Sequence, residues 1–272
     1  MHEVNTTRCS VPILTLNSAE YLEKCLQSVK NFTDVFLFDG NSTDGTFAIA
    51  EKYHVPVYKQ VDSKELNVKI NSFAEMREKS VDLTREDWVL FLDSDEFLSP
   101  ELTKEIEELL RGNPDPSLAF SFSYKYIING KVINHAYKSS EYIRLYNKKS
   151  GIIWDQHKLV HEKLKIPSTV RVIKLKNCFY GFVPAYGACI KKDKHYLSLV
   201  KKKILNKEKK VNYWEVLRSM LKNFFRAGKI LLLSFLVWLR WGFRDSLPPH
   251  HVWRYVRYHL FLVYYRFLQL FI

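Results

Sequence analysis

Apolar residues in the first 110 positions form short runs that alternate with segments of helical spacing. Four runs predict buried strands, at residues 9–14, 35–38, 55–58 and 88–92. The segments with three- and four-residue spacing predict helices over 21–29, 43–53, 67–80 and 99–110. We expect Asn17 to cap the first helix and Ser99 the last. Strands that alternate with helices of this length indicate βαβ crossovers and a mainly parallel sheet.

The pattern changes after residue 115. Residues 118–127 are aromatic and β-branched and lead into Asn129-Gly130, a pair typical of hairpin turns. Further strands are expected at 141–146 and 170–175, with a polar loop over 151–162 between them. From about residue 190 the chain has a helical, basic pattern. We therefore expect an α/β domain over 1–190 and a helical region over 191–272.

The charge is distributed unevenly between these two regions. Apolar residues make up 47% and charged residues 26% of the chain, which excludes a disordered or collagen-like protein. Residues 191–272 hold 18 Lys and Arg against 4 Asp and Glu, whereas residues 1–190 have a net charge of −1. The whole excess of positive charge therefore lies in the last third. Such a region seeks a polyanion, either nucleic acid or an anionic membrane surface.

The basic region also contains apolar and aromatic segments. Residues 230–239 form an apolar run that is too short to span a bilayer, which takes ~20 residues. Basic flanks with Trp, Tyr and Phe are typical of helices that lie among lipid headgroups, and the lysines of 201–210 add attraction to anionic lipid. We expect a peripheral membrane region. The alternatives are a core helix or a partner subunit, and no nucleic acid is expected because no reader motif is present.

Two acidic clusters follow two of the predicted strands. The first begins at Asp39, and the second contains Asp93, Asp95 and Glu96. In an open parallel sheet, ligands bind beyond the carboxyl ends of the strands. Three carboxylates within four residues repel one another unless a cation lies beside them, and Mg²⁺ or Mn²⁺ prefers oxygen ligands. The alternative is that these acids cap the following helices and face water.

Three segments, taken together, resemble a known family. The runs VPILTLNSAEYLEKCLQSV, FLFDGNSTDGT and WVLFLDSDEFLSPEL, in this order, resemble the inverting family 2 glycosyltransferases of GT-A fold. They are most similar to the lipopolysaccharide-core β-1,4-glucosyltransferase group, over residues 8–165. The resemblance implies a Rossmann-like GT-A catalytic domain and a nucleotide-sugar donor, which we expect to be UDP-linked.

The resemblance also implies roles for individual residues. Asp39 would bind the base of the donor, Asp93 would lie near the ribose, and Asp95 would be the direct ligand of Mg²⁺ or Mn²⁺. The expected donor-binding residues are Thr15, Leu16, Asn17, Asp39, Asn41, Asp93 and Arg144.

The acceptor side needs a general base, because an inverting transfer removes a proton from the acceptor hydroxyl. The triplet Val160-His161-Glu162 resembles a segment of the same group. It implies Glu162 as the base and His161 as a partner of the metal or phosphate, with Asp155 as the second candidate base. The alternative for His161 and Glu162 is a solvated pair on a surface strand.

The predicted function is therefore a metal-dependent inverting glycosyltransferase. It would move a hexose from a nucleotide-sugar to a lipid-linked saccharide such as lipopolysaccharide core. Residues 1–10 hold no apolar signal and the four cysteines form no CxxC pair, which predicts a cytoplasmic protein at the inner face of the membrane. A polyprenyl-phosphate sugar transferase is the alternative enzyme. A non-catalytic basic membrane- or nucleic-acid-binding module is the alternative of another class, although such a module has no need of Asp39, Asp93 and Asp95.

Overall fold

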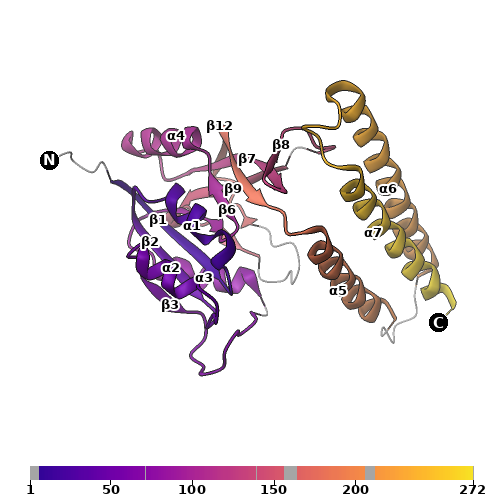
Figure 1. Cartoon of the computed structure of the whole chain (residues 1–272), viewed down its shortest axis with the longest axis horizontal. Coiled ribbons are helices and arrows are strands. Elements are labelled where there is room, and N and C mark those ends of the chain that lie inside the picture. The colour runs from indigo at the N-terminus through magenta and orange to yellow at the C-terminus, as the bar shows by residue number, and fades with distance from the viewer. Residues whose placement is uncertain (1–5, 71, 139, 156–163, 206–211, 272) are drawn as a thin grey trace. The chain divides into compact units, whose positions relative to one another are not determined.

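The chain forms two compact units, seen in the computed structural model of Figure 1. The structure describes residues 6–70, 72–138, 140–155, 164–205 and 212–271. The α/β unit comprises Met1–Lys125 and Ser140–Phe182, and the helical unit comprises Tyr126–Ser139 and Val183–Ile272. The chain therefore leaves the α/β unit once as a hairpin, returns to it, and leaves it again at residue 183.

One large sheet organises the α/β unit. Its strands follow the order β3-β2-β1-β4-β9-β7-β12-β6. Strand β1 runs parallel to β2, β4 and β5, and β2 runs parallel to β3. The pairs β4–β9, β9–β7 and β12–β6 are antiparallel, so the sheet is mixed, with the parallel part in the first half of the chain. The strands are β1 (Thr7–Thr15), β2 (Phe32–Asp39), β3 (Val57–Lys59), β4 (Trp88–Leu90), β5 (Leu92–Asp93), β6 (Glu96–Leu98), β7 (Leu118–Ile128), β9 (Ser140–Asn147) and β12 (Arg171–Phe182).

Four helices connect the strands of this unit and confirm the Rossmann-like α/β architecture. They are α1 (Ala19–Ser28), α2 (Thr46–Lys52), α3 (Phe73–Asp82) and α4 (Pro100–Arg111). Ser99 caps α4 as predicted, since its Oγ accepts the N–H of Leu102 at 3.1 Å. The cap predicted for α1 is wrong. Asn17 has a positive φ of 51° and lies one residue too early, and the N–H of Ala19 instead donates to Asp44 Oδ2 at 3.0 Å.

Both faces of the sheet are buried, which explains why residues 88–92 are apolar without alternation. Leu90 and Leu92 belong to a cluster with apolar residues of α1 and α4, whereas Val89 and Phe91 belong to a second cluster that includes Ala74 of α3. Phe91 also packs edge-on against Trp154, with ring centroids 5.4 Å apart. Trp154 belongs to β10 (Ile153–Trp154), which pairs with β11 (Leu164–Lys165).

The helical unit combines a hairpin with three helices. The end of β7 pairs with β8 (Lys131–Ile133), and Asn129 and Gly130 have φ values of 50° and 75°, which confirms the predicted turn. The helices are α5 (Tyr186–Leu205), α6 (Tyr213–Trp241) and α7 (Pro249–Leu268), followed by a short 3₁₀ turn at Gln269–Phe271; the other 3₁₀ turn, Lys148–Ser150, belongs to the α/β unit. The core of this unit contains Ile128, Ile133, Ala227, Ile230, Leu247, Val252 and Val256.

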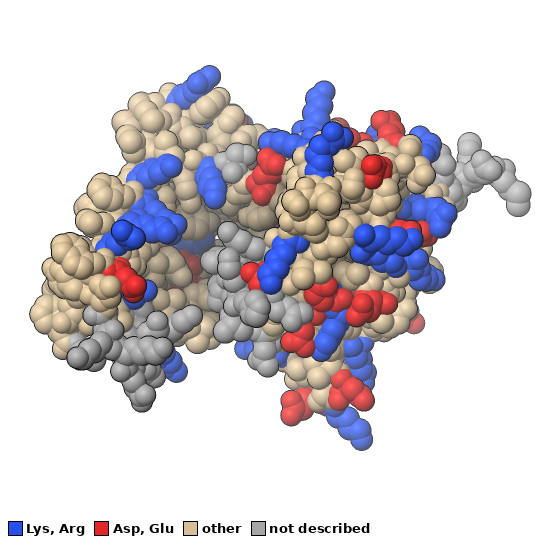
Figure 2. Space-filling model, turned by 180° about the vertical axis from the view of Figure 1, so that it is seen from behind, with Lys and Arg blue, Asp and Glu red and all other residues tan. Residues whose placement is uncertain are grey.

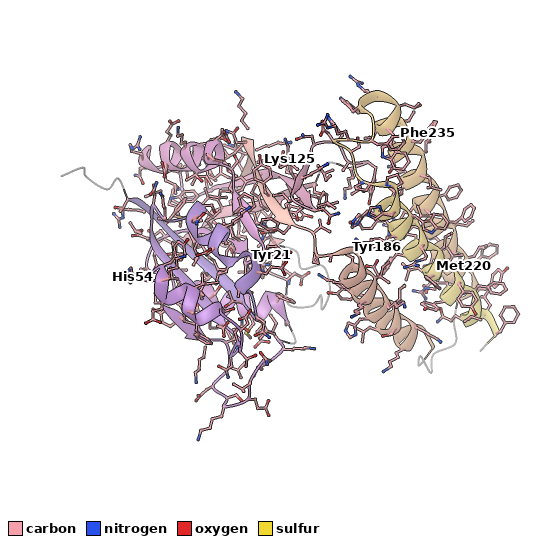
Figure 3. All side chains as sticks on the ribbon, in the orientation of Figure 1. Tyr21, His54, Lys125, Tyr186, Met220 and Phe235 are labelled. Atoms are coloured by element: carbon pink, nitrogen blue, oxygen red, sulfur yellow. The ribbon has the colours of Figure 1, made fainter. Side chains whose placement is uncertain are left out.

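Helix α6 is buried on one side only. Within the apolar run 230–239, Ile230 and Ser234 are buried, whereas Leu232 is 59% and Leu239 68% exposed. Phe235 is 54% exposed and is labelled in Figure 3, where it projects from α6. No helix within the described part of the chain combines the length and the apolar character that a membrane crossing requires.

The two units also differ in surface charge. In the space-filling view of Figure 2, acidic and basic side chains are mixed over the α/β unit. Over the helical unit, basic side chains are scattered across a largely uncharged surface with few acidic ones. This distribution matches the net charge counted along the sequence.

Candidate active site

The sheet register brings the two acidic clusters to the same edge of the α/β unit. Thr15 at the end of β1 is paired with Asp39 at the end of β2. On the other side of β1, Leu14 is paired with Asp93 of β5. The carboxyl end of β1 therefore lies between the two clusters, as expected for a ligand site at the edge of a parallel sheet.

Asp39 is fully buried and bonded to protein groups. Its Oδ2 accepts the hydroxyl of Thr15 at 2.7 Å and that of Ser42 at 2.6 Å, and its Oδ1 accepts the N–H of Ser42 at 2.7 Å. These bonds fold the loop after β2 back over the strand ends. Asp39 and Thr15 therefore shape the edge of the site. The base contact predicted for Asp39 and the donor binding predicted for Thr15 stay predictions.

Three asparagines with positive φ form the rim of this edge. Asn17, Asn41 and Asn67 have φ values of 51°, 60° and 55°. Asn17 Nδ2 donates to Asn67 Oδ1 at 2.9 Å, and the N–H of Asn67 donates to the carbonyl of Asn41 at 2.9 Å. Gly40 is required here because a Cβ would lie 2.7 Å from the carbonyl oxygen of Val68. The same Cβ would lie 3.2 Å from half-buried Leu16, so the three loops are closely packed.

Two buried arginines hold the second acidic cluster. Arg77 of α3 donates to Asp93 Oδ1 at 2.6 Å, and Arg144 of β9 donates to Glu96 Oε1 at 2.7 Å. Arg144 also lies 3.7 Å from Asp93 Oδ2. Partial burial of the Asp93 side chain opposes its ionisation, but the two arginines keep its pKa below the usual value. Burial raises the pKa of Glu96 to about 8, against the opposing effect of Arg144.

The expectation that the three neighbouring carboxylates need a metal ion to offset their repulsion is wrong for Asp93 and Glu96. The protein itself supplies two cations for Asp93 and Glu96, and both arginines are 6–7% exposed. Arg77 was missed in the sequence because it lies on a helix with charged neighbours. Its signal is its spacing, since Ala74, Arg77 and Ser80 are all buried and share one helix face.

Asp95 is the remaining candidate metal ligand of this cluster. It lies in the turn between β5 and β6, and its carbonyl accepts the N–H of Phe182 at 2.9 Å. Among the described residues, no group of three or more His, Cys, Asp or Glu side chains is placed to hold a metal ion. Mg²⁺ often binds through one or two carboxylates together with substrate phosphates. Asp95, with the 39% exposed Asp93, fits such a shared cation.

A pocket of about 460 Å³ adjoins the arginine pair. The guanidinium of Arg77 lies 4.6 Å from the ring of Trp154, and that of Arg144 lies 5.4 Å from the ring of Tyr142. Aromatic rings beside fixed charges suit a polar ring such as a sugar. The pocket is lined by Arg77, Glu141, Tyr142, Ile143, Arg144, Trp154, Leu164 and Ile166.

The candidate bases are only partly described. Asp155 follows Trp154, and its carboxylate is 15% exposed and 3.4 Å from Lys165 Nζ. His161 and Glu162 lie outside the described residues, so the expectation that Glu162 acts as the base and His161 as a metal or phosphate partner stays a prediction.

Known proteins resemble the chain over different lengths. An uncharacterized glycosyltransferase of Rickettsia conorii is 29% identical over 258 residues, which cover 91% of this chain and 87% of the relative. The lipopolysaccharide core biosynthesis glycosyltransferase LpsC of Rhizobium meliloti is 25% identical over 107 residues, 38% of this chain and 37% of LpsC. The crystal structure of S. aureus TarS 1–349 in complex with UDP has a TM-score of 0.46 and 16% identity, over 94% of this chain and 90% of TarS.

The family assignment rests on the sequence profile of glycosyl transferase family 2. This profile matches residues 10–163, which is more than half of the chain and includes both acidic clusters. The match agrees with the mixed Rossmann-like sheet of the α/β unit and with the relative that aligns along nearly the whole chain. The chain therefore belongs to glycosyl transferase family 2 and is a glycosyltransferase that uses a nucleotide-sugar donor.

Proposed function

We propose that the protein is a metal-dependent inverting glycosyltransferase that moves a hexose from a UDP-sugar to a lipid-linked saccharide such as lipopolysaccharide core. The observation that carries this proposal is the position of Asp93 and Asp95 at the end of β5, next to the Asp39 loop and beside two buried arginines. A fixed acidic edge with cations behind it suits a nucleoside diphosphate and its sugar.

In this proposal, the chain's own residues bind and orient the donor. The loops of Asn17, Asp39 and Asn41 hold the nucleoside, and Arg144 lies near the diphosphate. Arg77 keeps the Asp93 carboxylate in one orientation, so that it can accept a ribose hydroxyl without rearranging. A divalent cation held by Asp95 and Asp93, with His161 as a further partner, would stabilise the charge that develops on the departing diphosphate.

On the acceptor side, Glu162 takes the proton of the attacking hydroxyl, with Asp155 as the second candidate. The pocket beside Trp154 supports this arrangement, since Asp155 directly follows that tryptophan and the pocket adjoins Arg77 and Arg144. A hydroxyl acceptor needs such a base, whereas the phosphate of a polyprenyl-phosphate acceptor does not.

A membrane-bound acceptor is supported by the helical unit. Residues 191–272 carry a net charge of +14, and α6 exposes Leu232, Phe235 and Leu239. Basic residues around an exposed apolar helix face are typical of attachment to anionic membranes. We propose that the protein acts peripherally at the inner face of the cytoplasmic membrane. The partial similarity to LpsC supports a lipopolysaccharide-core acceptor.

The metal and donor assignment is tested with Asp95→Asn, which keeps the size of the side chain but removes its charge. We expect this variant to lose Mn²⁺-dependent binding of UDP in calorimetry, while its unfolding temperature stays close to that of the parent. Asp62→Asn, which neutralises an exposed acid of the same unit, is the matched control and should bind as the parent does. Binding of Mn²⁺ and UDP by Asp95→Asn at parental affinity would refute the metal assignment.

The base is tested by comparing Glu162→Gln with Asp155→Asn. We expect Glu162→Gln to retain donor binding and to lower turnover by ~10²–10⁴-fold, the usual contribution of general base catalysis. Loss of turnover only in Asp155→Asn would transfer the role to Asp155. Parental turnover in both variants would favour a phosphate acceptor, as in a polyprenyl-phosphate sugar transferase.

A further inference from the structure

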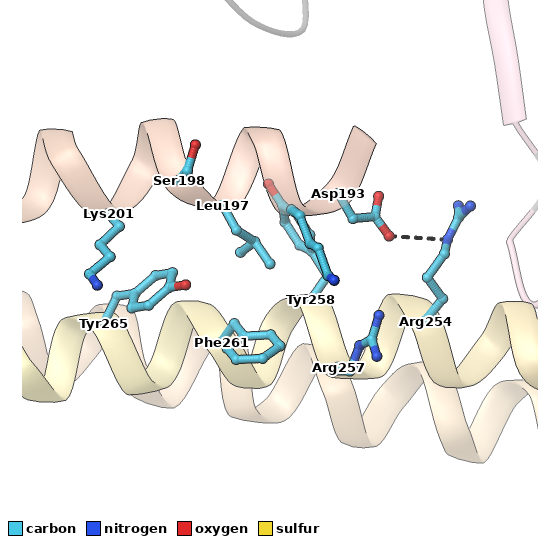
Figure 4. Close-up of a pocket in the computed structure, with 10 residues that line it drawn as sticks. Asp193, Leu197, Ser198, Lys201, Arg254, Arg257, Tyr258, Phe261 and Tyr265 are labelled. Carbon is cyan, nitrogen blue, oxygen red and sulfur yellow. Dashed lines mark ion pairs between the residues drawn. The ribbon is translucent and has the colours of Figure 1, made fainter. Parts of the chain in front are cut away.

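A second pocket lies within the helical unit, between α5 and α7 (Figure 4). Its volume is about 340 Å³, and it contains none of the residues assigned to the donor or the base. Five of its lining residues come from α5 and five from α7. They are Asp193, Lys194, Leu197, Ser198, Lys201, Arg254, Arg257, Tyr258, Phe261 and Tyr265.

The charged groups of this pocket leave an excess of positive charge. Asp193 is its only acid among the lining residues, and its Oδ2 lies 3.3 Å from Arg254 Nε. Both side chains of this pair are largely buried, so each neutralises the other. The lining includes no second acid to balance the charges of Lys194, Lys201 and Arg257. Arg257 forms no ion pair with another described residue. The pocket therefore offers three positive charges to a ligand.

The middle of the pocket is apolar. Figure 4 shows Leu197 of α5 and Phe261 of α7 between Lys201 on one side and Arg257 on the other. Leu197 is buried, whereas Phe261 is 38% exposed. Phe261 connects the pocket to the exposed apolar residues of α7, including Leu260 and Tyr264, which are 38% and 52% exposed. A ligand in this pocket can therefore continue along the apolar surface of the helix.

We propose that this pocket binds the phosphate group of an amphiphilic lipid. The phosphate would lie between Arg257 and Lys194, and the attached chain would cover Leu197 and Phe261. A guanidinium binds phosphate oxygens with two parallel hydrogen bonds, which favours this anion at Arg257. The adjoining apolar surface favours a phosphate on a hydrocarbon chain over free phosphate, because only the former buries Phe261.

The pocket would be one specific lipid site of the helical unit. This inference rests on the membrane attachment proposed above, because the membrane would be the source of the lipid. The test uses a soluble ligand, so that its outcome does not depend on vesicles or on transfer activity. The full-length protein is titrated in calorimetry with a short-chain alkyl phosphate below its micelle concentration. Inorganic phosphate and the alcohol of the same chain length are titrated in parallel.

We expect the alkyl phosphate to bind at least about tenfold more tightly than either fragment, a difference of about 1.4 kcal/mol. Equal binding of inorganic phosphate would show a free-phosphate site and overturn the lipid assignment. Equal binding of the alcohol would show that the pocket does not recognise the anion, which also overturns the proposal. This comparison needs only the parent protein and stands if a variant fails to fold.

A matched pair of variants places the site. Arg257→Gln should weaken alkyl phosphate binding about fivefold or more, the effect of about 1 kcal/mol for one basic contact. Arg226→Gln removes the same charge from an exposed position of α6 outside the pocket and should change binding less than about twofold. Equal loss in both variants would mean a diffuse charge effect and refute the pocket. Phe261→Ser should weaken binding of the alkyl phosphate but not that of inorganic phosphate.

The same samples separate this inference from the proposed enzyme function. Arg257→Gln should bind UDP with Mn²⁺ as the parent does, since Arg257 is not part of the donor site. If UDP binding fails in the parent while the alkyl phosphate binds, the proposed metal-dependent transfer fails and the lipid site stands. The reverse result would remove the lipid site alone.

Discussion

Arg144 is buried between two carboxylates, and its removal would leave Glu96 inside the protein without the cation beside it. Removing one partner of a buried ion pair costs about 3–5 kcal/mol. We expect Arg144→Met to lower the free energy of unfolding of the α/β unit by about this amount near pH 9, where Glu96 is ionised. Chemical denaturation followed by tryptophan fluorescence would measure it. The double variant Arg144→Met/Glu96→Gln should recover part of the loss, because the amide carries no charge.

This effect should depend on pH in a defined direction. Burial raises the pKa of Glu96 to about 8 in the parent, and without Arg144 the pKa should rise further. A group whose pKa is raised on folding stabilises the folded state at low pH and loses this contribution as the pH rises. Arg144→Met should therefore be less destabilised near pH 5 than near pH 9. A loss that is the same at both values would contradict the assignment of the cost to Glu96.

The sequence predicted the acids of the candidate site and Arg144, but it did not predict Arg77 or the pairing of the two arginines with these acids. Asp39, Asp93 and Asp95 follow apolar strands, so their place at one edge of the sheet follows from the fold. Arg77 comes from a helix sixteen residues before its partner, and Arg144 from an antiparallel strand. Neither pairing can be derived from local spacing, because that of Arg144 depends on β9 lying next to β4 and that of Arg77 on how α3 packs on the sheet.

At the scale of elements, one glycine of the hairpin and one of helix α6 should respond in opposite ways to replacement by alanine. Gly130 has a φ of 75°, and Gly228 lies within α6; a Cβ at either position would meet nothing within 4 Å. Gly130→Ala should therefore destabilise the helical unit by about 1 kcal/mol through backbone strain alone. Gly228→Ala should stabilise it by about 0.5–1 kcal/mol, the usual gain within a helix.

Thermal unfolding of the two variants would measure this contrast, with each glycine serving as the control for the other. Both substitutions add one methyl group in open space, so packing differences do not enter. A loss of stability on changing Gly228 would mean that α6 packs more closely than described, and an unchanged Gly130 variant would mean that the turn accepts alanine without strain.

Most elements of the α/β unit follow from local pattern, while their ends depend on tertiary contacts. The run 88–92 predicts a strand because both of its faces are buried. The sequence does not predict strand β6, because a glutamate such as Glu96 normally faces water, whereas here it is buried against Arg144. The N-terminus of α1 was misplaced because its cap comes from Asp44, twenty-five residues along the chain. Local spacing cannot contain such a contact.

At the scale of the whole molecule, charge and exposed apolar surface are both concentrated in one unit. Each basic residue near an anionic bilayer contributes about 1 kcal/mol, which salt screens, whereas buried apolar area is insensitive to salt. We expect the protein to sediment with anionic vesicles at low salt and to be only partly released at high salt. Leu232→Ser/Leu239→Ser should be released far more completely, because both leucines are exposed.

A matched control for this experiment is Trp238→Ser. Trp238 is partly buried, and its Nε1 donates to the carbonyl of Leu247 at 3.1 Å. Its replacement should therefore lower the unfolding temperature clearly and change the fraction of protein bound to vesicles only slightly. Complete release of the parent protein by salt alone would mean that the apolar face of α6 is covered by a partner subunit. The membrane assignment would then fail, and the assignment to family 2 would be unaffected.

The hairpin of residues 126–139 has a consequence for how the protein is made. Ile128 and Ile133 at its tip are buried against Leu247, Val252 and Val256, which the ribosome delivers more than a hundred residues later. At about 5–20 residues per second, the tip waits on the order of ten seconds for its covering helices. During this time, two isoleucines are open to chaperones and to aggregation. A protein shortened after residue 182 would keep this exposed tip permanently, so its poor yield would report a missing cover and not a missing membrane anchor.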